Sequence, residues 1–266
     1  THPELLDWLA ISFKQDWNVK ALLKKMVLSK TYQQQSVSNE VLDQKDPNNH
    51  LLARANASRL PAEIIRDNAL KISGLLNPKV GGESVRPYQP KGLWKEKNNF
   101  STYLFEYEES KGEDLYRRGL YTFIRRTSPP PNMLTFDATS REVCTVKRDV
   151  TSTPLQALVL LNDPQFFEAS RVFAERIIKS KDTLEEQIGY GFRLATSRNP
   201  KDKELEILVE LYNKQYKYFR ENRDKAYQVL SVGEKPRDKK INSVKSAAMT
   251  MVANTLLNHN ETYTKR

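Results

Sequence analysis

The chain has 266 residues and a formal net charge of +10 at pH 7. Charged residues make up 29% of the sequence and aromatic residues 9%, so the composition is that of a folded globular protein and excludes general disorder. No run of about twenty apolar residues occurs, which excludes a membrane-spanning helix in this chain.

The excess of basic residues favours polyanionic partners, which include nucleic acid, acidic lipid surfaces and anionic polysaccharide. A solvated basic surface that binds nothing specific accounts for the same charge equally well. Cys144 is the only cysteine, so the chain forms no internal disulfide and its compartment stays open. Because the chain begins at Thr1 without a signal-like apolar segment, we expect it to be a piece of a longer protein.

Two amphipathic helices are predicted at the N-terminal end. Thr1 and Glu4 have the spacing of a capping box, and Asn18 is expected to cap the second helix. The apolar residues fall at spacings of three and four, as on one face of a helix. They are Leu5, Leu6, Trp8, Leu9 and Phe13, followed by Val19, Leu22, Leu23, Met26 and Val27. Both helices therefore need a partner surface.

A third helix is predicted after Ser58, with Gly74 as its left-handed cap. From 78 to 112 the helical pattern disappears, and glycines and prolines punctuate the chain. The aromatic residues of this insertion argue against plain disorder, and Thr102 to Tyr107 alternates enough for a short strand. The aromatic residues are Tyr88, Trp94, Phe100, Tyr103, Phe105 and Tyr107.

The segment 116–163 is the densest in unusual chemistry. Two arginine pairs, at 117–118 and 125–126, bracket the apolar run 120–124, which fits a short strand or a helical turn. Three prolines and a loop of mixed charge follow. Thr153–Pro154 then starts the most apolar helix of the chain, 155–161, which we expect to be buried centrally.

Four more helical stretches are predicted before the chain ends. Asn162–Asp163–Pro164 caps one, Thr183 caps the next, Asn199–Pro200 begins a long one, and the last closes at Asn258 after a polar loop over 231–240. The sequence therefore predicts a mainly α, single multi-helix domain with a long irregular insertion and room for a small strand pair. Its parts are 1–77 (helical), 78–115 (insertion), 116–163 (central motif) and 164–266 (C-terminal helices).

Several kinds of site lack their usual residues. His2, His50 and His259 are scattered and no CxxC or CxxCH occurs, so we expect no metal site and no haem attachment in this chain. Phosphate-binding GxxxxGK[ST] and GxGxxG patterns are also absent. Cys144 has basic neighbours that favour a thiolate nucleophile, but a lone cysteine is more often a small buried residue, and we favour that alternative.

Carboxylates leave two interpretations open. Asp137 and Glu142, together with Glu63 and Asp67, can serve glycoside hydrolysis if the fold brings two of them close together. Because so many arginines stand nearby, we favour ion pairs that organise the central motif.

The arginines of the central motif give the candidate site. Guanidinium groups bind carboxylate, sulfate or phosphate through paired hydrogen bonds, and aromatic rings stack on sugars or bases. A purely structural role for the same residues is equally compatible with the sequence. The candidate ligand-binding residues are Arg117, Arg118, Tyr121, Arg125, Arg126, Asp137 and Arg141.

The sequence resembles the planctomycete-specific cytochrome-associated family, domain of unknown function 1553. The matching stretches extend over nearly the whole chain. They are HPELLDWLA at the start, RLPAEIIRDNAL, GG.SV.PY.P at 81–90, the long central motif from YRRGLYTFIRR to LLNDPQF, and LLNHNETY at the end.

The resemblance implies a setting rather than an activity. Members are typically C-terminal parts of large exported bacterial proteins with a companion domain upstream and often a c-type cytochrome segment. It thus implies a periplasmic or cell-surface location and polysaccharide utilisation as a loose association. No cofactor is expected in this chain, and any haem belongs to upstream sequence. Expected partners are the upstream domains of the same polypeptide and an anionic polysaccharide, whereas nucleic acid is not expected.

Two functional hypotheses follow. The leading one is an accessory or ligand-binding module for an anionic or glycan ligand in an exported, cytochrome-c-linked protein. The alternative is part of an oxidoreductase or carbohydrate-active enzyme whose site is shared with an upstream domain.

Overall fold

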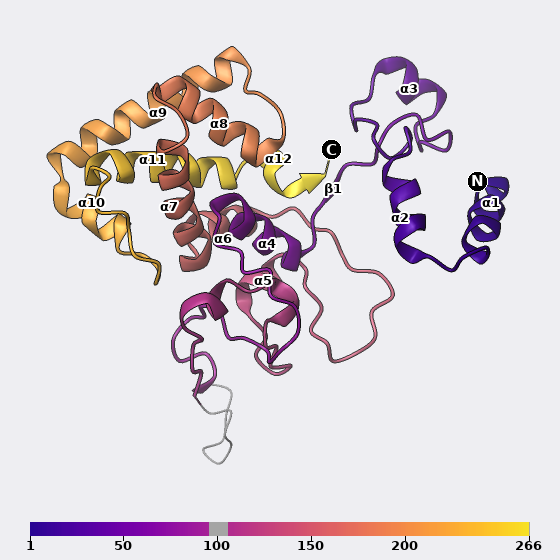
Figure 1. Cartoon of the computed structure of the whole chain (residues 1–266), viewed down its shortest axis with the longest axis horizontal. Coiled ribbons are helices and arrows are strands. Elements are labelled where there is room, and N and C mark those ends of the chain that lie inside the picture. Colours follow the sequence, from indigo (N-terminus) through magenta and orange to yellow (C-terminus); the bar gives the residue numbers. More distant parts are fainter. Residues whose placement is uncertain (96–105, 266) are drawn as a thin grey trace. The chain divides into compact units, whose positions relative to one another are not determined.

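The computed structural model describes residues 1–95 and 106–265, and its fold is mainly α-helical, as predicted (Figure 1). The chain forms two compact units, the smaller comprising residues 1–58 with the end of the chain from 264, the larger residues 59–263. Within the described ranges, no helix has the length and hydrophobicity needed to cross a membrane. The predicted boundary between residues 77 and 78 thus lies inside the larger unit.

The smaller unit holds α1 (Pro3–Lys14), α2 (Val19–Val27) and α3 (Glu40–Lys45). Asn18 caps α2 as predicted, since its Oδ1 accepts a hydrogen bond from Ala21 N at 3.0 Å. The predicted capping box of Thr1 is wrong, because α1 has His2 as N-cap with no side-chain cap bond. The structure describes all of α1 and α2, and none of their residues is buried.

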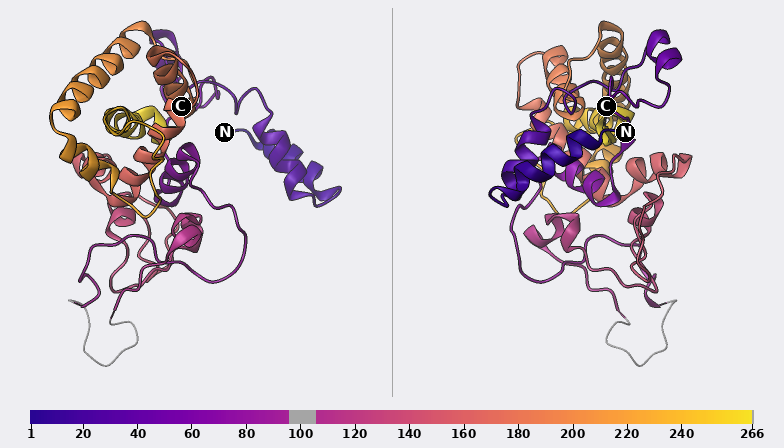
Figure 2. Two further views of the ribbon diagram at one scale, coloured as in Figure 1. Left: turned by 60° about the vertical axis from the view of Figure 1, so that its left-hand side comes forward. Right: turned by 90° about the vertical axis from the view of Figure 1, so that its right-hand side faces the viewer.

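The larger unit is built around α11 (Ser243–Leu257). Figure 2, left, shows α11 nearly end-on with other helices around it. It contacts α7 (Pro164–Ile178), α8 (Leu184–Thr196), α9 (Asp202–Glu221), α10 (Arg223–Leu230) and α6 (Pro154–Asn162). Small and apolar residues cover α11 on all sides and lie buried, which fits a helix at the centre of a core.

The prediction that the apolar helix of the central motif is buried centrally was wrong. In α6 only Gln156 and Leu160 are buried, while Leu155 and Leu158 are exposed by 56% and 53%. The central position belongs to α11, whose alanines and serines let neighbouring helices approach closely. The start of α6 at Pro154 and the Asp163 cap of α7 are confirmed.

Helix α4 (Ala62–Ser73) packs against α7 and ends at Gly74, which has a φ of 87° and is the predicted left-handed cap. The backbone N–H groups of Gly74, Leu75 and Leu76 all donate hydrogen bonds to Leu70 O, with N···O distances of 3.1, 2.8 and 3.0 Å. These bonds turn the chain sharply after the helix. The turn becomes one wall of the site described below.

The rest of the larger unit is short or irregular. The run 120–124 combines both predicted alternatives: the 3₁₀ helix η3 (Gly119–Tyr121) is followed by extended residues that bridge to Val85. A two-stranded sheet exists as predicted, but it does not belong to the larger unit alone: it is formed by β1 (Ser58–Arg59), where the division between the units falls in the chain, and β2 (Thr264–Lys265) of the smaller unit. Most of the predicted strand 102–107 lies outside the described residues. The remaining elements are η2 (Gly112–Tyr116), α5 (Pro131–Thr135) and α12 (Asn260–Tyr263).

An ion-pair network joins the end of α8, the start of α9 and α12. The Arg198 guanidinium donates to both carboxylate oxygens of Glu204, at 2.7 and 2.8 Å, and its Nε donates to Glu261 at 2.7 Å. The hydrogen bonds from Arg198 outweigh the effect of burial and lower the pKa of Glu204 to about 2. Glu204 also accepts from Lys201 N at the start of α9.

Glu204→Gln should lower the free energy of unfolding by about 1 kcal/mol at pH 7, because a partly solvated pair is screened by water. The depressed pKa means that this stability is fully present above about pH 4.5 and is lost as the pH falls towards 2. Urea unfolding of parent and variant at pH 7, 4.5 and 3 should show curves that converge at low pH. Glu206→Gln, an exposed neighbour on α9, is the control, and a pH-independent difference would contradict the assignment.

Candidate functional site

Arg117, the first predicted ligand residue, is buried, with 2% of its surface exposed. Its guanidinium donates to the carbonyl oxygens of Glu83, at 2.9 Å, and of Gly81. It also stacks on the ring of Tyr121 at 4.0 Å, and the Tyr121 hydroxyl accepts a hydrogen bond from Gly81 N at 2.8 Å. Arg117 and Tyr121 therefore hold the Gly81–Gly82 turn against the central motif.

The other predicted arginines lie in different surroundings. Arg125 stacks on Trp94 at 5.3 Å and donates to Trp94 O at 3.4 Å. Arg118 is half-exposed, with its Nε 3.7 Å from Asp67. Arg126 and Arg141 are exposed. The structure thus distributes these residues over several surroundings, and their contact with a ligand stays a prediction.

Asp137 closes the base of the loop 138–150, of which residues 141–150 are exposed. Its carboxylate accepts from Arg59 Nη2 at 2.5 Å and from Thr151 N at 2.8 Å, and Arg59 Nε donates to Thr151 O at 3.2 Å. Burial raises the pKa of the Asp137 carboxyl, but the bonds from Thr151 and Arg59 outweigh it, so the pKa lies below its ordinary value. These contacts join the two ends of the loop, which carries Cys144. The Cys144 side chain is exposed, so the expectation of a small buried cysteine was wrong.

The remaining carboxylates named from the sequence also have basic neighbours. Glu63 pairs with Arg148 at 2.8 Å, and Asp67 accepts from Gly119 N at 2.6 Å beside Arg66 and Arg118. Burial raises the pKa of Asp67. Burial also raises the pKa of Glu63, but the hydrogen bond from Arg148, a backbone hydrogen bond and the nearby arginine charges together outweigh it, so that pKa lies below its ordinary value. Across residues 1–95 and 106–265, His, Cys, Asp and Glu form no group of three that could hold a metal ion.

Arg66 positions the central motif on α4. Its Nε donates to Gln165 Oε1 at 2.8 Å and its Nη2 to Leu115 O at 2.7 Å, and Nη1 donates to Arg117 O. Burial lowers the pKa of Arg66 to about 10, which leaves the guanidinium charged at neutral pH. One buried cation thus connects α4, the first turn of α7, η2 and the residue that follows η2.

A second buried network fixes the loop 231–240 to α7. Glu168 accepts from Tyr88 Oη at 3.0 Å, from Tyr116 Oη at 2.9 Å and from Lys235 N at 2.7 Å. Burial, followed by the charge of Glu168, raises the pKa of Tyr116, so its hydroxyl stays protonated and donates. Glu168 is 1% exposed. Its buried carboxylate therefore fixes the positions of the Tyr116 ring and of the loop backbone at Lys235.

Arg171 completes this network. It lies 3.8 Å from Glu168 and 3.5 Å from Glu175, and it donates to the carbonyl oxygens of Val232, at 3.1 Å, and Lys235. Gly233, with a φ of 88°, lies where any Cβ would overlap the Glu168 side chain. The loop is thereby held by buried charges rather than by apolar contacts.

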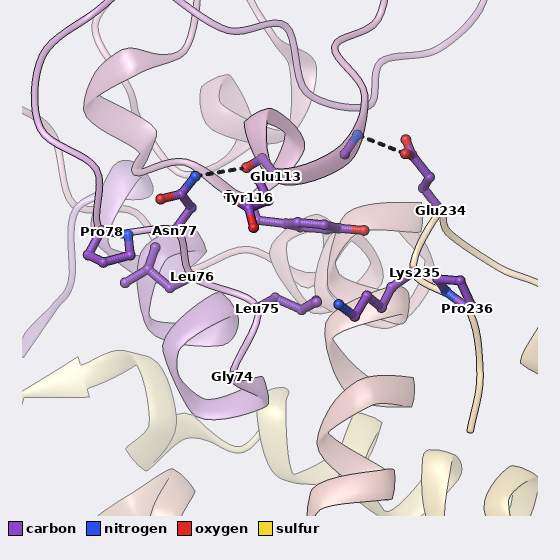
Figure 3. Close-up of a pocket in the computed structure, with 11 residues that line it drawn as sticks. Gly74, Leu75, Leu76, Asn77, Pro78, Glu113, Tyr116, Glu234, Lys235 and Pro236 are labelled. Atoms are coloured by element: carbon purple, nitrogen blue, oxygen red, sulfur yellow. Dashed lines mark hydrogen bonds between the residues drawn. The ribbon is translucent and has the colours of Figure 1, made fainter. Parts of the chain in front are cut away.

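These networks build a cavity of about 500 Å³, which we call the Tyr116 pocket (Figure 3). Three chain segments form its walls: the turn after α4, η2 and the loop after α10. Hydrogen bonds join the walls, from Asn77 N to Tyr116 O at 2.9 Å, from Asn77 Nδ2 to Glu113 O at 3.4 Å and from Gly112 N to Glu234 Oε1 at 2.7 Å. The pocket is therefore pre-formed, and its lining residues are Gly74, Leu75, Leu76, Asn77, Pro78, Gly112, Glu113, Tyr116, Glu234, Lys235 and Pro236.

The lining mixes an apolar floor with a few polar groups. Figure 3 shows the Tyr116 ring lying across the pocket and the Lys235 side chain reaching towards Leu75. Within the described part of the chain, no carboxylate lies within ion-pair distance of Lys235 Nζ. A volume of this size, with an aromatic wall and scattered donors and acceptors, suits a small polar organic ligand.

None of the seven residues predicted as the ligand site lines the Tyr116 pocket. The sequence offered only weak signals for it. Gly74 and Pro78 mark a turn, and the polar stretch 231–240 marks a loop, but nothing in their spacing shows that they meet. The one direct link is Tyr116, which stands beside the arginine pair.

A model of the family of unknown function DUF1553, called PSD1, matches residues 1–212. The chain belongs to the DUF1553 family. This confirms the DUF1553 membership inferred from the motifs, and the match ends within α9 and leaves 213–266 outside it. No curated protein and no solved structure matches this DUF1553 chain. The Tyr116 pocket combines residues from the matched range with Glu234, Lys235 and Pro236 beyond it.

Proposed function

We propose that the larger unit of this DUF1553 chain is a ligand-binding module whose Tyr116 pocket takes a neutral sugar. The observation that carries the proposal is the combination of an aromatic ring with a free ammonium, a carboxamide and two carboxylates around one pre-formed cavity. Sugars present apolar C–H faces that pack on aromatic rings, and hydroxyl groups that both donate and accept hydrogen bonds.

The charges around the pocket favour a neutral ligand over an anionic one. Glu113 and Glu234 oppose the single ammonium of Lys235. The C-terminal end of α4, which carries the negative end of the helix dipole, also faces the pocket through Gly74 and Leu75. The anionic ligand expected from the arginine pairs is therefore the weaker candidate for this cavity.

Calorimetric titration of the whole chain with neutral oligosaccharides, polygalacturonate and dextran sulfate at low and high salt tests the proposal. We expect saturable binding of at least one neutral oligosaccharide, with a Kd that changes less than about twofold with salt. Lys235→Ala should weaken this binding at least about fivefold, since a hydrogen bond to a charged group is lost. The backbone N–H of Lys235, which donates to Glu168, remains in that variant.

Lys239→Ala is the matched control, because Lys239 is exposed on the same loop and does not line the pocket. Binding of polyanions only, with a steep loss in salt, would contradict the proposal, and so would equal binding by both lysine variants. Export, an upstream haem and a role beside upstream domains are further proposals that rest on the family resemblance alone.

A further inference from the structure

The smaller unit presents an apolar surface that its own residues do not cover, which we call the α1–α2 face. Its side chains are each exposed by between 42% and 69%, and they come from both helices and the residues that follow each of them. They are Leu5, Leu6, Trp8, Ile11, Trp17, Val19, Leu23, Met26, Val27 and Leu28. Apolar patches of this kind, rimmed by polar residues, mark interaction sites.

The two helices do pack on each other, but only along one edge. Leu9, Phe13, Ala21 and Leu22 are half-buried between them, and the rings of Phe13 and Trp17 meet edge to face at 5.3 Å. Helices of 9 and 12 residues are too short to be stable in water without a partner for their apolar stripes. The α1–α2 face therefore requires another surface to pack against its apolar side chains.

The segment that carries this face is rich in exposed lysine. Residues 1–30 hold five of them, at 14, 20, 24, 25 and 30, against Glu4, Asp7 and Asp16, and α2 contains no acidic residue. All five are exposed, and none makes an ion pair within the described residues. Lys25 shows how such a side chain lies here: its Nζ donates to Ser12 Oγ at 2.6 Å and sits 5.7 Å from the Trp8 ring.

We propose that the α1–α2 face binds the surface of an anionic phospholipid membrane. In α2 the apolar Val19, Leu23 and Met26 recur at helical spacing and all the charged residues are lysines, which is the pattern of helices that lie in the membrane interface, and α1 adds Trp8. Lysine stems reach along apolar surface to the headgroups, and tryptophan favours the boundary between headgroups and acyl chains. At 1.5 Å per residue, neither helix is long enough to cross the bilayer, so both lie parallel to its surface.

The positive charge of the lysines also argues against a second copy of this chain as the binding partner of the α1–α2 face. Two copies would bring the same lysines face to face, and like charges across an interface oppose association. The cores of protein interfaces are depleted in lysine, whereas an anionic lipid surface attracts each lysine separately.

Co-sedimentation of the whole chain with vesicles tests this proposal. We expect binding to vesicles that mix phosphatidylglycerol with phosphatidylcholine, and at least about tenfold weaker binding to phosphatidylcholine alone. Lys20→Gln/Lys24→Gln/Lys30→Gln should weaken binding to the anionic vesicles by more than about tenfold. Lys203→Gln/Lys214→Gln/Lys217→Gln on α9 removes the same charge elsewhere and should leave binding nearly unchanged.

The apolar contribution is tested in the same assay. Leu6→Gln/Leu23→Gln should abolish most binding, while Ile207→Gln, an equally exposed apolar residue of α9, should not. Brominated lipids should quench the tryptophan fluorescence of the parent, and Trp8→Phe/Trp17→Phe, which leaves only Trp94, should remove that quenching.

The proposal is overturned if anionic vesicles do not bind, if neutral vesicles bind as well, or if the quenching persists in the Trp94-only variant. Capture of an acidic protein with no vesicle binding would overturn it as well. All these outcomes are separate from sugar binding, which involves residues of the larger unit only.

Discussion

Arg171→Met should lower the free energy of unfolding by about 3–5 kcal/mol, the usual cost of breaking a buried ion pair. The variant leaves Glu168 and Glu175 without their cation and frees the carbonyl oxygens of Val232 and Lys235. Methionine fills a similar volume, so lost charge compensation rather than a cavity causes the effect. Urea unfolding monitored by circular dichroism measures it.

Arg193→Met on α8 serves as the control for Arg171→Met. Arg193 is exposed, and its replacement should change stability by less than about 0.5 kcal/mol. Adding Glu168→Gln to Arg171→Met should restore part of the loss, since one uncompensated carboxylate disappears. The network does not hold the loop if Arg171→Met lowers the free energy of unfolding by less than about 1 kcal/mol, or if Arg171→Met/Glu168→Gln is no more stable than Arg171→Met alone.

Arg66→Met is expected to be nearly as severe, at about 3–5 kcal/mol, because it leaves three buried acceptors without their charged donor. These are Gln165 Oε1 and the carbonyl oxygens of Leu115 and Arg117. Since the last two flank Tyr116, sugar affinity should fall in any fraction that remains folded. Thermal unfolding and titration of the folded variant at low temperature measure the two effects.

Lys71→Met on the same helix removes a positive charge from an exposed position and should leave both stability and binding unchanged. If Arg66→Met behaves like this control, α4 is not connected to the Tyr116 pocket in the way described.

Much of the helical architecture could be predicted because its signals are local. Asn18, Thr183 and Asp163 each cap the helix that was expected to follow them, and Gly74 and Asn258 each end one. Caps depend on a few neighbouring residues, so single positions decide them. The placement of α6 at an edge could not be predicted in this way, since its apolar composition also suits a central helix.

The burial of individual charged side chains could not be predicted from the sequence. Arg117 and Arg126 look alike in the sequence, yet one is 2% exposed and bonded to a turn more than thirty residues earlier, while the other is exposed. Likewise, Glu168, Arg171 and Glu175 have the spacing of an ordinary surface ion-pair series on a helix. Only the fold reveals that these three are buried, because loop 231–240 covers them.

The Tyr116 pocket could not be predicted for the same reason. Asn77, Tyr116 and Lys235 are far apart in the chain, and their meeting depends on contacts of Arg66, Glu168 and Arg171 that no local pattern encodes. The sequence singled out the motif that contains Tyr116, which is the one residue of that motif that lines the pocket. It assigned ligand contact to Arg117, Arg125 and the other candidate residues, which do not line this pocket, and that assignment stays a prediction.

The most direct test of the account is an amide NMR map of the isotope-labelled whole chain, titrated with a neutral oligosaccharide that binds in the calorimetric panel. We predict that the largest shifts occur at the side-chain amide of Asn77 and at the backbone amides of Gly112, Tyr116 and Lys235. Amides of the outer face of α9 should remain unchanged. Shifts confined to Arg126 and loop 138–150, with the resonances of Asn77 and Tyr116 unmoved, would contradict the account.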